Sequence, residues 1–320
     1  MGRNPLRLGI VMDPIGSITP KKDSSLAMLL EAGHRGARLH YFEQRDIRLM
    51  RGQALGRARR LTVVDNNDAW FEFGTEEEVT LGELDVILMR KDPPFDMEYV
   101  YTTYILERAA LAGALVVNAP QALRDINEKA YTAWFPELTP RTLMTRAMDD
   151  LRAFLGEHGH IVVKPLDGMG GRSVFVVRAG DNNANVIFET LTDNGRRFAV
   201  AQVYLPEIRE GDKRILLVDG EPVPYALARI PPADDNRGNL VMGATGRGQP
   251  LSARDREIAT AVGAVLRDKG VVFAGLDVIG DYLTEVNVTS PTGIRELDRA
   301  FGINIAGQLF DAIERRLDRG

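Results

Sequence analysis

The residues best suited to chemistry lie in the segment 275–292, which reads GLDVIGDYLTEVNVTSPT. Two apolar runs, 271–279 and 282–288, are rich in Val, Ile and Leu and are joined by Gly280-Asp281. Short apolar runs separated by such a pair are typical of a β-hairpin. The segment therefore predicts a hairpin that carries two carboxylates and one amide among apolar residues.

The facing of these polar side chains depends on how the two strands are joined. Glu285 and Asn287 are two residues apart, so both side chains leave the same face of their strand. Asp277 joins that face if the connection spans three residues with a bulge, whereas a two-residue turn pairs it with Thr284 and points it away. On one face, the three oxygen ligands suit Mg²⁺, which is bound through one or two carboxylates plus substrate phosphates. The alternative is an edge strand with exposed polar positions.

A second group of residues predicts a phosphate site. Lys164 ends an apolar strand and precedes Gly168, Gly170 and Gly171. Glycine lets backbone N–H groups approach phosphate oxygens, and an ammonium group supplies a point charge. The chain contains neither a P-loop nor a dinucleotide fingerprint, and a predicted strand, 173–177, follows the glycines instead of a helix. Two strands joined by a glycine loop indicate a flap over nucleotide phosphates. A flexible hairpin turn is the alternative.

Two arginines and one aspartate follow predicted strands at places where a ligand could bind. Arg90 follows the strand 84–89, Arg229 precedes a long loop, and Asp13 follows the first strand. Parallel α/β sheets bind ligands beyond the carboxyl ends of their strands, and arginine recognises carboxylates and phosphates through paired hydrogen bonds. We therefore expect Arg90 and Arg229 to anchor an acidic substrate, although a surface position is the commoner fate of arginine.

Alternating strands and helices must position these residues. In the first third of the chain this alternation predicts a doubly wound parallel sheet. Its predicted strands are 6–12, 38–42, 84–89 and 114–117, its helices 24–33 and 97–113, and 52–73 is read as extra strands.

A smaller unit follows, and then a last segment that contains the hairpin. The smaller unit has predicted helices 127–135, 148–158 and 185–191 and strands 141–145, 161–164, 173–177 and 198–203. The last segment has strands 214–218 and 223–229, the hairpin, and helix 304–317. The glycine-rich stretch 231–250 predicts a mobile lid, because unstructured loops of that length are uncommon unless functional, with an inert linker as the alternative. We place the domains at 1–124, 125–203 and 204–320.

Composition excludes several classes of protein. The 320 residues are 44% hydrophobic and 27% charged with a net charge of −5, which gives no overall attraction to nucleic acid or anionic membranes. The absence of cysteine excludes disulfides, thiolate metal sites and cysteine nucleophiles. No run approaches a membrane helix, and the first apolar run is too short for a signal peptide. We expect a cytoplasmic protein.

The order of these features resembles the ATP-grasp fold. Lys129 comes first, then Lys164 with its glycine flap, a linker at 202–205, and Asp277 with the later Glu-x-Asn pair. Across nearly its whole length the chain more narrowly resembles the prokaryotic glutathione synthetase family. The segments that carry this resemblance are GIVMDP (9–14), KDSS (22–25), ILMRKDPPF (87–95), YILE (104–107), NEK (127–129), KPLDGMGG (164–171), GDKR (211–214), DGEPVPY (219–225) and LTEVNVTSPT (283–292). The chain departs from the family at Arg172, where a small residue is usual, and in the loop sequence VMGATG (241–246).

The resemblance implies a fold, a reaction and a role for each matching residue. The fold is ATP-grasp, preceded by a Rossmann-like domain. The reaction joins γ-glutamylcysteine to glycine with ATP and Mg²⁺ (or Mn²⁺) through an acyl phosphate, giving glutathione, ADP and phosphate. ATP would be bound by Lys129, Lys164, Gly168, Met169, Gly170, Gly171, Gln202, Val203, Tyr204, Leu205 and Asp212. The metal would be held by Asp277, Glu285 and Asn287, the acyl phosphate would face Arg214 and Arg229, and the peptide and glycine would meet Asp13, Arg90, Ser290 and Thr292. The 231–250 loop would close over the intermediate, and the family suggests a homotetramer.

Three other functions stay open from the sequence. Another ATP-grasp ligase, adding glutamate or D-alanine, would share the nucleotide site. A non-catalytic nucleotide-binding regulator is a second alternative, against which the complete set of metal-site residues argues. A nicotinamide-dependent oxidoreductase would need a glycine fingerprint after the first strand, which the residues 12–16 do not supply.

Overall fold

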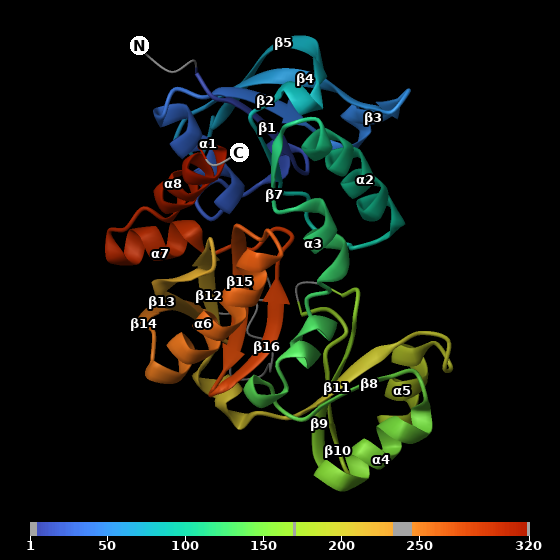
Figure 1. Cartoon of the computed structure of the whole chain (residues 1–320). Helices are drawn as coiled ribbons and strands as arrows, with labels where there is room; N and C mark the ends of the chain where they lie inside the picture. The colour runs from blue at the N-terminus through green and yellow to red at the C-terminus, as the bar shows by residue number, and fades with distance from the viewer. Residues whose placement is uncertain (1–4, 169–170, 233–244, 319–320) are drawn as a thin grey trace.

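The first sheet has the parallel arrangement predicted from the alternating pattern. The computed structural model describes residues 5–168, 171–232 and 245–318. Four parallel strands lie in the order β2-β1-β6-β7, and helices α1 and α2 connect them (Figure 1). Their bounds are β1 Arg7–Val11, α1 Ser24–His34, β2 Arg38–Phe42, β6 Val86–Met89, α2 Met97–Leu111 and β7 Leu115–Val117. Each strand is short and almost wholly buried, as expected for a parallel sheet covered on both faces.

Antiparallel strands extend this sheet beyond β2. The segment 52–73 forms strands as predicted, but β4 Gln53–Val63 pairs with β5 Phe71–Thr80, which runs further than expected. A short strand that the sequence analysis missed, β3 Ile47–Met50, pairs with β4 on the same side as β2, and β5 pairs along the other side of β4.

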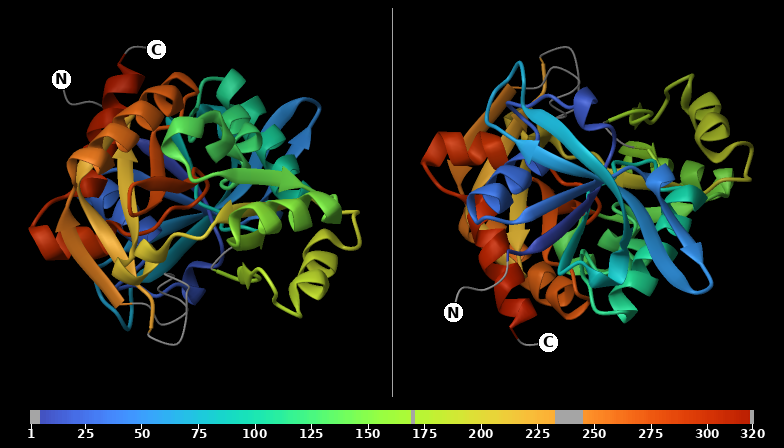
Figure 2. Two further views of the ribbon diagram at one scale, coloured as in Figure 1. Left: turned by 90° about the horizontal axis from the view of Figure 1, so that it is seen from below. Right: turned by 90° about the horizontal axis from the view of Figure 1, so that it is seen from above.

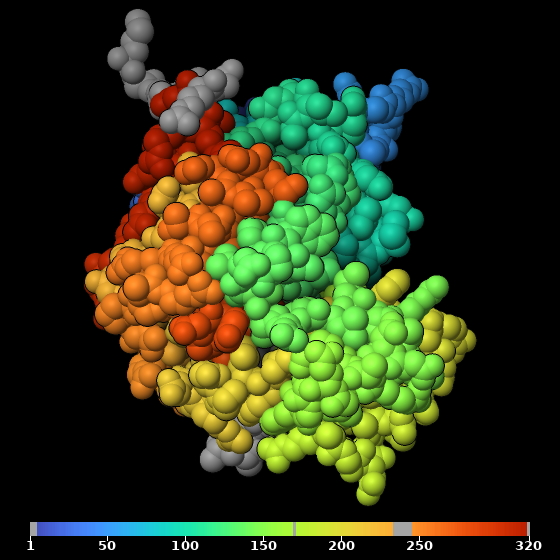
Figure 3. All heavy atoms as spheres, turned by 60° about the horizontal axis from the view of Figure 1, so that its bottom comes forward, coloured from blue at the N-terminus to red at the C-terminus, as the bar shows by residue number. Residues whose placement is uncertain are grey.

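The second sheet is a separate antiparallel layer covered by two helices. Its order is β10-β9-β11-β8, with α4 Met148–His158 and α5 Ala184–Thr192 packed on one face through a small apolar core of their own. The strands are β8 Thr142–Thr145, β9 His160–Pro165, β10 Phe175–Arg178 and β11 Ala199–Val203. Figure 3 shows this lobe, green to yellow, against the orange part of the chain, around residues 250–290.

The helix predicted over 127–135 is wrong. The chain there forms two short 3₁₀ helices, η4 Ala130–Trp134 and η5 Pro136–Leu138. The Asn127 side chain accepts hydrogen bonds from the backbone N–H groups of Lys129 (3.1 Å) and Ala130 (3.0 Å), as in a helix cap. The turns that follow are nevertheless of the 3₁₀ type, and the Phe135 N–H donates to the Thr132 carbonyl three residues earlier (2.9 Å). Just upstream, α3 Pro120–Asp125 begins with proline at its first position.

The third sheet carries the predicted hairpin at its edge. Its antiparallel order is β14-β13-β12-β15-β16, with β12 Asp212–Val218, β13 Glu221–Ile230, β14 Thr245–Pro250, β15 Phe273–Ile279 and β16 Tyr282–Asn287. Strand β14 occupies part of the predicted 231–250 loop, so that prediction is wrong for 245–250. Residues 233–244, most of the predicted lid, lie outside the described residues.

Helix α6 Ala253–Asp268 packs against the third sheet and was not predicted. Two sequence signals could have located it. Ser252 and Asp255 form a capping box at its start, and the fully buried Ile258, Val262 and Leu266 recur every four residues.

The chain returns to the first sheet at its end. Helices α7 Ile294–Phe301 and α8 Ile305–Leu317 lie beside α1 in Figure 1, and Figure 2 shows the same proximity from two other sides. The Arg35 guanidinium, just after α1, bonds α8 at the Gly307 carbonyl (3.0 Å), Asp311 (2.8 Å) and Glu314 (2.9 Å). Leu8 and Ile10 of β1 share one apolar cluster with residues of α8. No helix within the described ranges is long and apolar enough to cross a membrane. The domain boundaries after residues 124 and 203 stay predictions.

Candidate functional site

A bulge in the hairpin decides which way its acidic side chains face. The connection has two residues, because Ile279 pairs with Tyr282 and Val278 with Leu283. The register then shifts, and Asp277 pairs with Glu285. The extra residue is Thr284, whose hydroxyl donates to the Asp277 carbonyl (3.1 Å). The turn therefore has two residues and not three. The bulge nevertheless brings the side chains of Asp277, Glu285 and Asn287 to one face of the hairpin, as a three-residue connection would have done.

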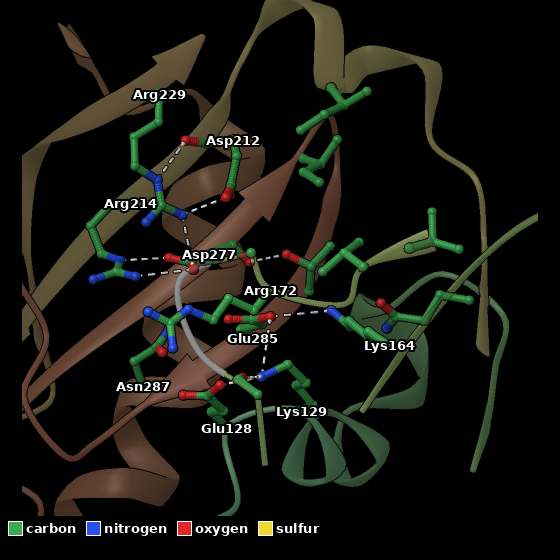
Figure 4. Close-up of a pocket in the computed structure, with 18 of the residues that line it drawn as sticks. Glu128, Lys129, Lys164, Arg172, Asp212, Arg214, Arg229, Asp277, Glu285 and Asn287 are labelled. Carbon is green, nitrogen blue, oxygen red and sulfur yellow. Dashed lines mark hydrogen bonds and ion pairs between the residues drawn. The ribbon is translucent and has the colours of Figure 1, made fainter. Parts of the chain in front are cut away.

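That face opens onto a cavity of about 360 Å³ between the second and third sheets (Figure 4). Most of the residues predicted from the sequence line it, although they come from segments far apart in the chain. They are Lys129, Lys164, Gly168, Gly171, Gln202, Val203, Tyr204, Leu205, Asp212, Arg214, Arg229, Asp277, Glu285, Asn287, Ser290 and Thr292. Met169 and Gly170 lie outside the described residues.

Two lysines converge on Glu285 in the middle of this pocket. The Lys164 ammonium lies 3.3 Å from a Glu285 carboxylate oxygen, and the Lys129 ammonium lies 3.8 Å from the same oxygen. Lys129 also pairs with Glu128 and donates to the Gly168 carbonyl (2.6 Å). Its side chain is only 4% exposed, so Lys129 is a buried pocket residue and not a solvated helix lysine.

The neighbouring charges keep this cluster ionised. Burial raises the pKa of Glu285, but Lys129 and Lys164 lower it by more, so the pKa lies below its ordinary value. For Lys129, burial lowers the pKa, but Glu285 and Glu128 together raise it above the ordinary value. The Glu285 carboxylate and the Lys129 ammonium therefore coexist as ions inside the pocket.

Two arginines hold Asp277 on the other side of the pocket. Arg214 makes a bidentate contact with the Asp277 carboxylate (2.5 and 3.0 Å), and Arg229 lies 2.9 Å from it. Burial raises the pKa of Asp277, but both guanidinium groups lower it further, to well below the usual range. Arg229 also pairs with Asp212, yet burial beside two other carboxylates raises the pKa of Asp212 to about 7.

The predicted metal ligands fit a cation that shares its coordination with a nucleotide. Asp277 and Glu285 face each other as carboxylates with lowered pKa values, which is the form that binds Mg²⁺. The buried Asn287 Nδ2 and Asp212 Oδ1 have no hydrogen-bond partner among the described residues, so polar capacity is left over in the pocket. No three His, Asp or Glu side chains in the described ranges gather so as to hold a metal by themselves. Phosphate oxygens would have to supply the remaining ligands.

The linker predicted to bind a planar base forms one wall of the cavity. Gln202 donates to the Thr142 hydroxyl (3.1 Å), and the Tyr204 ring stacks on His160 with centroids 4.0 Å apart. The apolar side chains Val162, Val174, Val176, Leu227 and Ile279 line the same cavity. A narrow apolar wall of this kind suits the faces of an aromatic base.

Asp13 and Arg90 do not line this cavity, but both contact the loops at its rim. Arg90 is buried and donates to the Ser25 hydroxyl (3.0 Å) and the Pro291 carbonyl (2.9 Å). Asp13 accepts from Lys91 (2.9 Å) and from the backbone N–H of Asp92 (2.9 Å). They join the first sheet to the 289–292 segment and to the loop after β6.

Sequence reasoning did not single out two acidic residues of the pocket. Glu128 pairs with Lys129, and Asp92 accepts from the Ser290 hydroxyl. Each stands next to, or two residues from, a predicted site residue in the chain, which is the only sequence signal that could have found it.

Comparisons with known proteins agree with this geometry. Residues 6–124 match the family model of the prokaryotic glutathione synthetase N-terminal domain, and residues 128–302 match that of the prokaryotic glutathione synthetase ATP-grasp domain. A glutathione synthetase of Salmonella typhimurium is 60% identical over 98% of this chain and 99% of the relative. One of Yersinia pestis is 60% identical over 98% of each.

Solved structures share the fold at low identity. A D-cycloserine synthetase superposes with a TM-score of 0.68 at 17% identity, covering 97% of this chain and 99% of that one. The D-alanine–D-alanine ligase of Bacillus anthracis, complexed with ATP, superposes with a TM-score of 0.58 at 16% identity, covering 99% and 98%. At these identities the likeness concerns the fold alone.

Proposed function

Because the chain belongs to the prokaryotic glutathione synthetase family and is an ATP-dependent ligase of glutathione synthesis, we propose that the pocket described above is where γ-glutamylcysteine is joined to glycine. The observation that carries the proposal is the convergence of two lysines on a carboxylate that the bulge places opposite Asp277. The alternatives of another ligase or a regulator are not favoured by relatives of this identity.

The reaction needs an activated carboxyl group. The cysteinyl carboxylate of the dipeptide is a poor acyl donor until its oxygen takes the γ-phosphoryl group of ATP. The amine of glycine then attacks the acyl carbon, and the tetrahedral intermediate expels phosphate. Such transfers depend on positioning and on neutralising charge, not on a protein nucleophile. The absence of cysteine from the chain is compatible with this route.

The ion pairs of the pocket suggest how each charged residue takes part. When ATP binds, Lys129 and Lys164 would release Glu285 and pair with phosphate oxygens instead. The Glu285 carboxylate would then be free to bind a cation. Asp277, Glu285 and Asn287 would then hold one or two Mg²⁺, or Mn²⁺, and a bound cation of this kind supplies positive charge between the phosphates and the acyl group. The Gly168–Gly171 flap would cover the phosphates, and the 202–205 linker with Asp212 would hold the nucleoside.

The arginines and the rim residues would handle the acyl group and the substrates. Arg214 and Arg229 are placed to donate to the oxygens of the acyl phosphate and its tetrahedral successor, since both already bind oxygen anions there. Ser290 and Thr292 in the pocket, with Asp13 and Arg90 behind them, would bind the dipeptide and glycine. The cytoplasmic location stays a prediction.

A glutamate substitution tests this assignment. In the wild type, ADP should form over repeated turnovers only when γ-glutamylcysteine, glycine and Mg²⁺ are all present. Glu285→Gln keeps the shape of the side chain but removes its charge, so ADP formation should fall at least about a hundredfold. Glu257→Gln, which changes an exposed residue of α6, is the control. Near-normal turnover by a folded Glu285→Gln variant would remove the metal role.

We also propose that the chain assembles with copies of itself, as the homotetramer that the family suggests. Met97, Tyr101, Tyr104 and Leu111 are large apolar side chains exposed on α2. Their spacing of four, three and seven residues places them along one side of the helix. An exposed apolar stripe of this length is typical of an interface. Light scattering should report a tetramer that Tyr101→Lys disrupts, and a monomeric wild type would contradict the proposal.

A further inference from the structure

The cations of the pocket are almost all neutralised by its own carboxylates. Lys129 and Lys164 pair with Glu285, and Arg214 and Arg229 pair with Asp277. A ligand anion that approaches any of these four groups must compete with the carboxylate already paired to it. Their contribution to anion binding is therefore reduced by the cost of breaking an existing ion pair.

Arg172 differs from the other cations of the pocket. It lies just after the flap glycines, lines the same cavity, and makes no ion pair or hydrogen bond with any residue that the structure describes. Figure 4 shows its side chain reaching into the pocket toward the end of β16 that carries Asn287. A guanidinium has five N–H donors in a fixed planar arrangement and stays charged at any physiological pH. This group is therefore ready to bind an anion without breaking an ion pair among the described residues.

The position of Arg172 restricts which anion it can meet. The nucleoside would lie along the 202–205 linker, whereas Glu285 and Asn287 mark the opposite end of the pocket, where the phosphoryl group is transferred. Arg172 is directed toward that opposite end. The oxygen anions expected there belong to the terminal phosphate of the nucleotide and to the acyl phosphate made from it.

We propose that Arg172 binds the oxygens of the phosphoryl group in transfer, and so makes this flap selective for a nucleoside triphosphate over a diphosphate. The proposal rests on the proposed function, because it takes the ligand to be ATP. A guanidinium contact to phosphate is charge-assisted and bidentate, which makes it stronger than a backbone contact from glycine. The third phosphate is then recognised by the Arg172 side chain.

Nucleotide binding by calorimetry tests the assignment without turnover. The probes are Mg²⁺ with AMPPNP, which retains a third phosphate, and Mg²⁺ with ADP, which lacks one. For Arg172→Ala we expect AMPPNP affinity to fall about tenfold or more, because the charge-assisted contact is lost, and ADP affinity to change by less than about twofold. The AMPPNP affinity of Arg172→Lys, which keeps the charge but not the planar donor pair, should lie between those of the wild type and Arg172→Ala.

A second arginine provides the control. Arg196→Ala removes the same charge from an exposed side chain of the same lobe, which pairs with Asp193 and does not line the pocket. It should leave both affinities unchanged. The proposal would be overturned if wild type and Arg172→Ala bound AMPPNP with equal affinity, or if Arg172→Ala lost affinity equally for both nucleotides. It would also be overturned if the variant lost affinity for γ-glutamylcysteine alone. Binding of AMPPNP stays measurable if no glutathione is formed, so failure of the proposed reaction and failure of this contact are distinguishable.

Discussion

The contact between α6 and the turn that joins β12 to β13 gives a sharp prediction of stability. Gly263 lies inside α6 against Gly220, whose φ of +83° suits glycine. A Cβ at position 263 would overlap the Gly220 carbonyl oxygen and lie 3.0 Å from its carbonyl carbon and 3.3 Å from its Cα. All three are backbone atoms, which cannot rotate away. Gly263→Ala must therefore move the helix or the turn.

Two opposing effects set the size of this change. Alanine is favoured over glycine inside a helix by about 1 kcal/mol. Forcing an extra carbon into a tight contact costs about 1–3 kcal/mol, and overlap with backbone atoms places this case at the upper end. We expect Gly263→Ala to lower the free energy of unfolding by about 2 kcal/mol after the helix gain is subtracted.

Another helical glycine offers a matched control. Gly156 lies inside α4, and a Cβ there would meet no heavy atom within 4 Å. Gly156→Ala should therefore raise the free energy of unfolding, by up to about 1 kcal/mol. Urea titrations of wild type and both variants, followed by circular dichroism, give the midpoints and slopes that are needed. If both substitutions change stability in the same direction, the reasoning from the Gly220 contact is refuted.

Three further predictions concern charged and polar groups. Lys213→Met should lower the free energy of unfolding, measured in urea, by about 3–5 kcal/mol, because it leaves the fully buried Asp255 carboxylate without its ion-pair partner. Adding Asp255→Asn to this variant should recover part of the loss, and a double variant whose loss equals the sum of the two single losses would contradict the prediction. The pKa of Asp212 is raised to about 7, so the protonated carboxyl favours the folded state. The free energy of unfolding should therefore fall as the pH rises from 5 to 8, and Asp212→Asn should flatten this fall. Parallel plots of unfolding free energy against pH for wild type and variant would exclude this prediction. Asn118→Ala should cost about 3 kcal/mol or more in urea unfolding, because the Asn118 side chain bonds four backbone groups at the ends of β15 and β16; a cost near zero would show that water replaces it.

Regular local patterns made much of the fold predictable from the sequence. The bounds expected for the strand 38–42 and the helix 148–158 match β2 and α4. The strand is a short and almost wholly buried run, and the helix ends clearly at the left-handed Gly159. The pocket residues were found because short motifs of unusual residue types marked them.

Tertiary packing decided what the sequence could not. The bulge at Thr284 depends on burying Leu283 and Val286 on the third sheet, and the local sequence is compatible with either register. The pairing of Arg214 with Asp277 joins residues 63 positions apart, so spacing along the chain says nothing about it. The segment 127–135 forms 3₁₀ turns where an α-helix was predicted, and the local residue types do not distinguish these two kinds of helical turn.

The docking of α8 onto the first sheet has a consequence for how the protein is made. Leu309, Phe310 and Ile313 are fully buried and complete the apolar cluster around Leu8 and Ile10. A ribosome releases those strand residues first and the helix that shields them last. Until α8 has been synthesised, one apolar face of the nascent sheet is exposed to solvent or is covered by a chaperone. The incomplete chain is therefore more prone to aggregation than the finished protein.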